Sequence, residues 1–139
     1  MKKIFIDSSF FIAILHRGDQ HHKEAAGIAS KLENIQFVTT EMVLAEVLNS
    51  LANKGNYTRQ IATSYVEEMF RDENTLIITQ NEAQFMKGFE LYKKLNDKTC
   101  GLTDCVSFNT MNEEKISEVL TFDKKDFSQF RLNVKPNSG

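Results

Sequence analysis

The residues with the clearest chemical potential are four acids at special places in the chain. Two follow apolar runs typical of strands, one opens an expected helix, and one lies within an apolar helical segment. In that order they are Asp7, Asp123, Asp104 and Glu46. Carboxylates held close together repel each other, and a divalent cation reverses this effect. Hard cations such as Mg²⁺ and Mn²⁺ choose oxygen ligands, and a metal bound in this way can activate water and stabilise charge on a phosphate.

Asp7 is the residue around which we expect the site to be organised. Residues 4–6 form an apolar run typical of a strand buried on both faces, and residues 10–15 continue as an apolar helix. Ser8 or Ser9 is a suitable N-cap for that helix. Asp7 therefore ends the first strand, at the edge where open α/β sheets bind ligands. We expect the other three acids to be brought to this edge.

Each acid also has a plain structural explanation. Asp7 suits a helix cap or turn, Asp104 complements the dipole of a first helical turn, and Asp123 suits a solvated turn. Glu46 borders an apolar helix face, where carboxylates are seldom buried unless paired, although it can lie on the wet side of that helix. Four such coincidences favour a common cause, a metal site. The hydroxyls expected to support the carboxylates or metal-bound waters are Ser8, Thr103 and Thr121.

Strand and helix patterns alternate along the chain that positions these acids. Further strands are expected at residues 35–38, 76–78 and 119–122, with a last turn and edge strand between 127 and 134. Apolar spacing predicts helices at 10–15, 21–34, 41–54, 58–70, 81–95 and 103–111. Expected caps are Thr39 or Thr40, Thr58, Gln80 or Asn81, and Thr103, with Gly55 ending the third helix. This order predicts an α/β fold of three layers, a mostly parallel central sheet flanked by helices.

Size and composition indicate one soluble domain. The chain has 139 residues, 41% of them hydrophobic and 26% charged, which is ordinary for a globular protein. We expect a single domain over residues 1–134 and a polar tail over 135–139. The net charge of −2 excludes a polycation, so nucleic acid would have to be bound through a local basic face or through metal ions.

The expected location is a reducing cytoplasm. No apolar stretch reaches the roughly 18 residues of a membrane span, and the N-terminus does not resemble a signal peptide. The two cysteines, Cys100 and Cys105, do not make a disulfide framework, and their expected role is that of small buried hydrophobes.

Taken in order, the motifs resemble the PIN-domain family, close to the VapC-type toxin ribonucleases of toxin–antitoxin pairs. The matching segments are Ile4-Phe5-Ile6-Asp7-Ser8-Ser9, Thr39-Thr40 with Leu44-Ala45-Glu46, Gly101-Leu102-Thr103-Asp104-Cys105, and Leu120-Thr121-Phe122-Asp123 with Phe127. Each segment is weak alone, but the ordered set spans nearly the whole chain. The family's metal-binding acids fall on Asp7, Glu46, Asp104 and Asp123, and Asp126 is a possible fifth acid.

The resemblance implies a PIN-like α/β/α domain that cleaves RNA phosphodiesters with water activated by Mg²⁺ or Mn²⁺. It also implies a homodimer and an antitoxin that blocks the site. The alternative is a non-catalytic RNA-binding or protein-interaction PIN domain, against which the intact acid set argues. Receiver-type and haloacid-dehalogenase-like domains are disfavoured because Thr79 and Ser9 stand where those folds need aspartates.

Substrate contacts are expected from basic residues in loops or at helix ends. These are Arg17, Lys54, Arg59, Lys124 and Lys125, each of which can contact phosphate or simply belong to a charged surface. A histidine group, His16, His21 and His22, is assigned to a polar loop and helix start without a catalytic role.

Overall fold

Parallel strands form the central sheet of the protein. The computed structural model describes residues 1–95, 100–128 and 133–135. The strands are β1 (Lys2–Ile6), β2 (Ile35–Thr40), β3 (Thr75–Ile78), β4 (Glu118–Leu120) and β5 (Asn133–Lys135), in the order β3-β2-β1-β4-β5. All four pairings among these described strands are parallel. The predicted α/β sheet is confirmed, and Asp7 directly follows its central strand.

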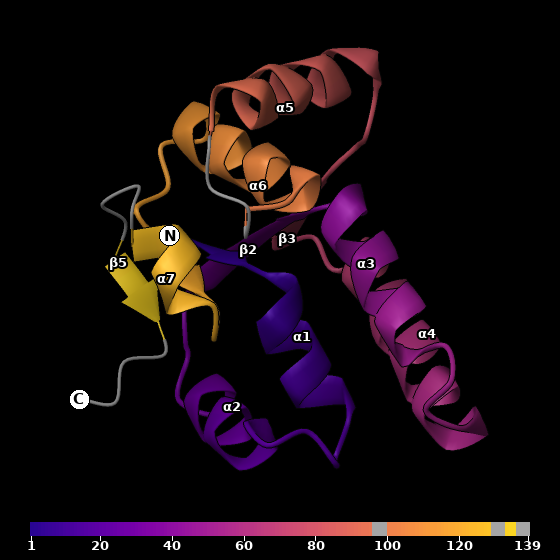
Figure 1. Ribbon diagram of the computed structural model, residues 1–139. Helices are drawn as coiled ribbons and strands as arrows, with labels where there is room; N and C mark the ends of the chain where they lie inside the picture. The colour runs from indigo at the N-terminus through magenta and orange to yellow at the C-terminus, as the bar shows by residue number, and fades with distance from the viewer. Residues whose placement is uncertain (96–99, 129–132, 136–139) are drawn as a thin grey trace.

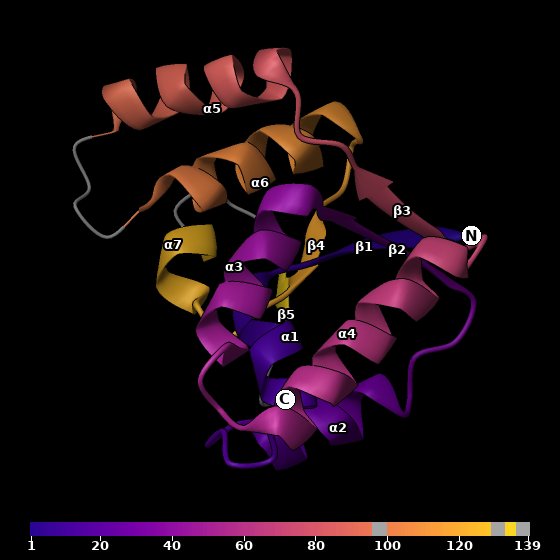
Figure 2. The same cartoon turned by 90° about the vertical axis from the view of Figure 1, so that its right-hand side faces the viewer.

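Helices cover both faces of the sheet and make three layers (Figure 1). They are α1 (Ser8–Leu15), α2 (His22–Ala29), α3 (Glu41–Leu51), α4 (Asn56–Arg71), α5 (Glu82–Lys94), α6 (Leu102–Glu113) and α7 (Lys124–Ser128). Figure 2 shows α5 lying outside α6, farther from the sheet. No helix among the described residues is both long and apolar enough to cross a membrane.

The centre of the core lies around β1. Phe5 pairs with Val38 of β2 and with Val119 of β4, and all three residues are fully buried. A parallel strand covered on both faces is expected to be apolar along its length, as Ile4 to Ile6 are. Each such side chain contributes about 1.5–3 kcal/mol by leaving water. This packing fixes the point at which β1 ends and Asp7 begins.

Some predicted caps are confirmed. Thr40 accepts a hydrogen bond from the Val43 N–H at 3.1 Å, and Asn81 accepts one from the Gln84 N–H at 2.9 Å. The prediction for α1 was wrong, because its N-cap is Asp7 and its first helical residue is Ser8.

Other helix ends differ from the predictions. The N-cap of α4 is Gly55, at φ 96°, rather than Thr58, so this glycine begins α4 instead of ending α3. The N-cap of α6 is Gly101 rather than Thr103. The second helix ends at Ala29, earlier than predicted, and Asn34, at φ 54°, directly precedes β2.

The C-terminal part also departs in detail. β4 ends at Leu120, two residues earlier than predicted, and β5 includes Lys135, where the polar tail was expected to begin. The expected loop at 97–101 lies mostly, and the residues 136–139 of the expected tail lie wholly, outside the described residues.

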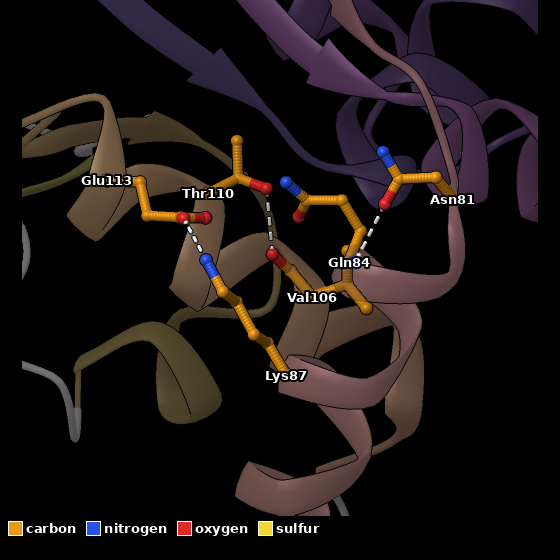
Figure 3. Close-up of polar contacts among 6 residues, drawn as sticks. All are labelled: Asn81, Gln84, Lys87, Val106, Thr110 and Glu113. Atoms are coloured by element: carbon orange, nitrogen blue, oxygen red, sulfur yellow. Dashed lines mark hydrogen bonds and ion pairs between the residues drawn. The ribbon is translucent and has the colours of Figure 1, made fainter.

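A close helix pair forms the outer layer above the sheet. Gly88 of α5 is buried against α6, and a Cβ at this position would lie 2.5 Å from Val106 Cγ2. Lys87 reaches across to Glu113 of α6, with Nζ and Oε2 2.6 Å apart (Figure 3). The absent side chain of Gly88 therefore permits the close approach of these helices.

Candidate functional site

Asp7 is buried at the carboxyl end of β1, with only 2% of its surface exposed. One of its oxygens is held by two hydroxyl groups. Thr121 Oγ1 donates a hydrogen bond to Asp7 Oδ2 at 2.7 Å, and Ser9 Oγ donates to the same oxygen at 3.1 Å. Thr121 directly follows β4, and Ser9 lies in the first turn of α1. Together with β1, which ends at Asp7, these elements fix the orientation of this carboxylate.

The other oxygen of Asp7 is available for a ligand. Oδ1 is buried and has no hydrogen-bond partner among the described residues. A buried carboxylate oxygen without a partner is costly, and it needs an explanation in terms of an unseen partner such as an ion. The arrangement therefore points one carboxylate oxygen toward its supporting hydroxyls and leaves the other free to bind.

The environment of Asp7 disfavours its charged form. Burial is the main cause that raises the pKa of Asp7 above its ordinary value of 3.8, and the nearby charge of Glu46 raises it further. The hydrogen bonds from Thr121 and Ser9 and the nearby Ser8 backbone N–H act in the opposite direction. A cation beside Asp7 would stabilise the carboxylate and lower this pKa.

Thr121 and Ser9 also hold the chain that leads to Asp123. The Asp123 N–H donates to Thr121 Oγ1 at 2.9 Å, and the Phe122 N–H donates to Ser9 Oγ at 2.8 Å. The two hydroxyl oxygens are 3.1 Å apart. This network ties the segment after β4 to the start of α1, and it places the Asp123 backbone at the same edge of the sheet as Asp7.

Glu46 joins this edge from α3 and lies on the exposed side of that helix, one of the two placements that the sequence left open. Val43, Leu44 and Val47 take the core-facing side of the helix, and the Glu46 side chain stays exposed. Ser8 Oγ donates a hydrogen bond to Glu46 Oε1 at 2.5 Å. Ser8, which directly follows Asp7 in the chain, therefore links Glu46 of α3 to the start of α1.

Asp104 lies in the first turn of α6, which packs against α3 and β2. It is partly buried, and its Oδ2 accepts a long hydrogen bond from the Gly101 N–H at 3.4 Å. The side chain of Asp126 lies outside the described part of the chain. Within residues 1–95, 100–128 and 133–135, no three His, Cys, Asp or Glu side chains stand together as a metal site.

The donor set nevertheless fits a hard divalent cation. The candidate ligands are all carboxylate oxygens, which Mg²⁺ and Mn²⁺ prefer, and Asp7 Oδ1 is already buried without a partner. Without a cation, negatively charged carboxylates repel one another, so their side chains are expected to stay apart in this structure. The side chain of Glu46 is exposed, and those of Asp104 and Asp123 are half-buried.

Sequence reasoning found two of the supporting hydroxyls and missed a third. Thr121 and Ser8 contact the expected carboxylates, Asp7 and Glu46, while the supporting role of Thr103 stays a prediction. Ser9 was considered only as a helix cap, yet it contacts Asp7 directly. The available signal was the pair of hydroxyl residues that follows the acid at the end of a buried strand.

The basic residues vary in how freely they could meet a substrate. Lys124 and Lys125 are exposed at the start of α7, directly after Asp123. Arg59 instead donates to the Ala52 carbonyl at 2.9 Å, and the Arg17 guanidinium lies 5.8 Å from the centre of the Tyr57 ring. The two lysines are therefore the cations best placed for phosphate near the site.

The histidines have structural contacts in the described structure. The His21 ring stacks on Phe122 with ring centres 4.2 Å apart, and His22 Nδ1 lies 2.7 Å from the Ala13 carbonyl oxygen. These contacts attach the segment between α1 and α2 to its surroundings.

Fold and sequence together define the class of the protein. The family model described as PIN domain matches residues 4–132, nearly the whole chain. The chain belongs to the PIN-domain family, as its ordered motifs predicted.

Solved structures show the same fold. VapC20 from Mycobacterium tuberculosis, described as a Sarcin-Ricin loop cleaving toxin, has a TM-score of 0.79 at 20% identity, covering 93% of this chain and 95% of that one. A toxin–antitoxin complex from Klebsiella pneumoniae has a TM-score of 0.62 at 17% identity, covering 90% of each chain. VapBC2 from Rickettsia felis, bound to a DNA fragment from their promoter, has a TM-score of 0.63 at 15% identity, covering 96% of this chain and 97% of that one. Comparison with curated proteins found no match.

Proposed function

We propose that this protein is a metal-dependent endoribonuclease, the toxin of a type II toxin–antitoxin pair, and that Asp7 is the first ligand of its Mg²⁺ or Mn²⁺. The observation that carries the proposal is the Asp7 carboxylate. It is buried at the ligand-binding edge of the sheet, with Oδ2 held by two hydroxyls and Oδ1 without a partner among the described residues. This is how a carboxylate is oriented for a hard cation.

Each neighbouring residue has a definite part in this proposal. Asp7, Glu46, Asp104 and Asp123 hold the ion, which when bound supplies an activated water and stabilises charge on the scissile phosphate. Thr121 and Ser9 orient Asp7, and Ser8 orients Glu46. Lys124 and Lys125 contact phosphates of the RNA beside the site.

The solved relatives support the choice of substrate and partner. VapC20 is described as cleaving the Sarcin-Ricin loop, and two of the similar structures are toxin–antitoxin complexes. We therefore assign RNA as the substrate and an antitoxin protein as the partner that blocks the site. A toxin that acts on cellular RNA works in the cytoplasm, where we place this protein.

The face of a homodimer is best sought on α5. This helix exposes an apolar stripe made of Phe85 (42% exposed), Met86 (45%), Phe89 (39%) and Tyr92 (49%). Contiguous apolar surface of this kind marks interaction sites. On the same side of α5, Glu82 lies at the N-terminal end and Lys93 lies near the C-terminal end. An antiparallel pair of α5 helices would set Glu82 of each copy near Lys93 of the other.

The test of the proposed activity is cleavage of an RNA panel by purified protein with Mg²⁺, with Mn²⁺ and with EDTA. Asp7→Asn should reduce metal-dependent cleavage by more than the roughly 100-fold loss that removal of an outer-shell contact causes. Glu73→Gln, which removes a carboxylate charge from an exposed residue, is the control and should cleave like the wild type. Full activity in a folded Asp7→Asn protein would refute the assignment of Asp7.

A second candidate is a non-catalytic PIN domain that binds RNA or protein. One observation favours it, because no three candidate ligand side chains already stand together among the described residues. This candidate predicts that wild type and Asp7→Asn both bind RNA or the antitoxin, and that neither cleaves with any metal.

A further inference from the structure

Two thiols lie in contact beside the candidate site. Cys100 Sγ and Cys105 Sγ are 3.9 Å apart, and both residues are buried, with 3% and 0% of their surfaces exposed. Cys100 directly precedes Gly101, the N-cap of α6, and Cys105 lies in that helix directly after Asp104. A pair of cysteines that served only as small hydrophobes would have no need to meet sulfur to sulfur at this helix start.

We propose that Cys100 and Cys105 form an intramolecular disulfide on oxidation by a peroxide, and that this bridge moves Asp104 out of its working position. The first half is independent of the activity assigned above, whereas the second half rests on the proposed function. The two sulfurs must approach from 3.9 Å to the disulfide distance of about 2 Å, which requires a shift at one or both ends of the Gly101 turn.

The oxidation is a two-electron step with hydrogen peroxide as the oxidant. The Cys100 thiolate attacks one peroxide oxygen and the O–O bond breaks, so that Cys100 becomes a sulfenic acid and the released hydroxide takes up a proton to form water. Cys105 Sγ then attacks Cys100 Sγ, the S–O bond breaks, and a second water leaves with the Cys105 proton. One peroxide is reduced to two waters, and two thiols become one disulfide.

The order of attack follows from the surroundings of the two sulfurs. Cys100 retains slight exposure, whereas Cys105 has none. Cys105 is therefore poorly suited to attack first and well placed to resolve the sulfenic acid. Because larger oxidants and thiols of other proteins are excluded by burial, the product is a bridge within one chain.

The bridge would act on the site through the first turn of α6. Asp104 stands between the two cysteines in sequence, and its carboxylate accepts the Gly101 N–H. A displacement of about 1 Å in a reacting group can cost about 100-fold in rate. We therefore expect oxidation to reduce RNA cleavage by about 100-fold and to weaken Mn²⁺ binding, and a thiol reductant to restore both.

The experiment treats wild type and Cys100→Ser with hydrogen peroxide and follows three readouts. Trypsin releases residues 99–115 as one peptide that contains both cysteines. In the wild type this peptide should become lighter by two hydrogen atoms, and dithiothreitol should reverse the change. Mn²⁺ affinity and RNA cleavage are measured on the same samples. Reduced Cys100→Ser should cleave like reduced wild type and keep its activity in peroxide.

Each outcome bears on a separate part of the proposal. A wild-type peptide that only gains oxygen, or stays unchanged, overturns the disulfide. A bridge that forms without changing Mn²⁺ affinity overturns its coupling to Asp104. Equal loss of activity in Cys100→Ser overturns the role of the bridge in inactivation. If reduced wild type cleaves no RNA, the proposed function fails, while the peptide mass and Mn²⁺ affinity still decide the bridge and its coupling.

Discussion

Thr121 offers the sharpest test of how the site is built. Its hydroxyl donates to Asp7 Oδ2 at 2.7 Å and accepts the Asp123 N–H at 2.9 Å, and the residue is fully buried. Thr121→Val keeps the shape of the side chain and removes only the hydroxyl function. Thr121→Ser keeps the hydroxyl and removes a methyl group. The two variants therefore separate hydrogen bonding from packing.

The expected magnitudes follow from these contacts. A hydrogen bond to a charged group contributes about 1.5–3 kcal/mol, and a buried N–H left without an acceptor costs about 1–3 kcal/mol. We expect Thr121→Val to lower the free energy of unfolding by about 3 kcal/mol. Loss of one buried methyl group in Thr121→Ser should cost about 0.8 kcal/mol. In a domain of this size the melting temperature should fall by about 4 °C for each kcal/mol.

The assay is urea unfolding of both variants and wild type in EDTA, followed by RNA cleavage with Mg²⁺. The valine variant should be the less stable of the two by about 2 kcal/mol. It should also lose about 10- to 100-fold in cleavage, as is typical when an outer-shell contact to a metal ligand is removed. A purely steric role predicts the reverse order, with valine tolerated and serine destabilised, and that result would refute the reasoning.

Three further predictions concern stability and assembly. Because the folded-state pKa of Asp7 is raised, the stability that this residue contributes is lost as pH rises from 3.8 through the raised value. Asp7→Asn should thus have a larger free energy of unfolding than wild type in EDTA at about pH 8. Urea titration should find no such difference between the two proteins near about pH 4. Gly88→Ala should lower the free energy of unfolding by about 1–3 kcal/mol, because its Cβ would meet Val106 at 2.5 Å. Gly27→Ala in α2, where nothing lies within 4 Å, should instead raise it by about 0.5–1 kcal/mol, and equal effects of the two changes would contradict the close helix approach. If the proposed homodimer forms through α5, Phe89→Glu should convert it to monomers in sedimentation analysis without loss of helical signal, and an unchanged dimer would exclude this face.

The features predicted well from the sequence depend on short stretches of chain. The run from Ile4 to Ile6 is apolar without interruption, and this predicts a buried parallel strand that ends at Asp7. Thr40 and Asn81 cap their helices through residues three positions away, so local pattern was sufficient.

The features that escaped prediction depend on segments far apart in the chain. Ser9 Oγ lies 3.1 Å from Thr121 Oγ1, more than a hundred positions away, and no local pattern reveals that both hydroxyls meet on Asp7 Oδ2. Glycine is more common just after a helix than at an N-cap, so the sequence favoured Gly55 as the end of α3, whereas it begins α4. Glu46 is exposed because three apolar neighbours occupy the core side of α3, which the sequence alone left open.

The position of the metal is the most direct test of the central claim. We would soak a crystal of the wild-type protein in Mn²⁺ and calculate an anomalous difference map. The proposed site predicts a peak about 2.1 Å from Asp7 Oδ1, with Oδ2 still bonded to Thr121 and Ser9 and with further carboxylates turned toward the ion. A peak on another part of the surface, with Asp7 Oδ1 unliganded in a protein that cleaves RNA with Mn²⁺, would contradict the claim.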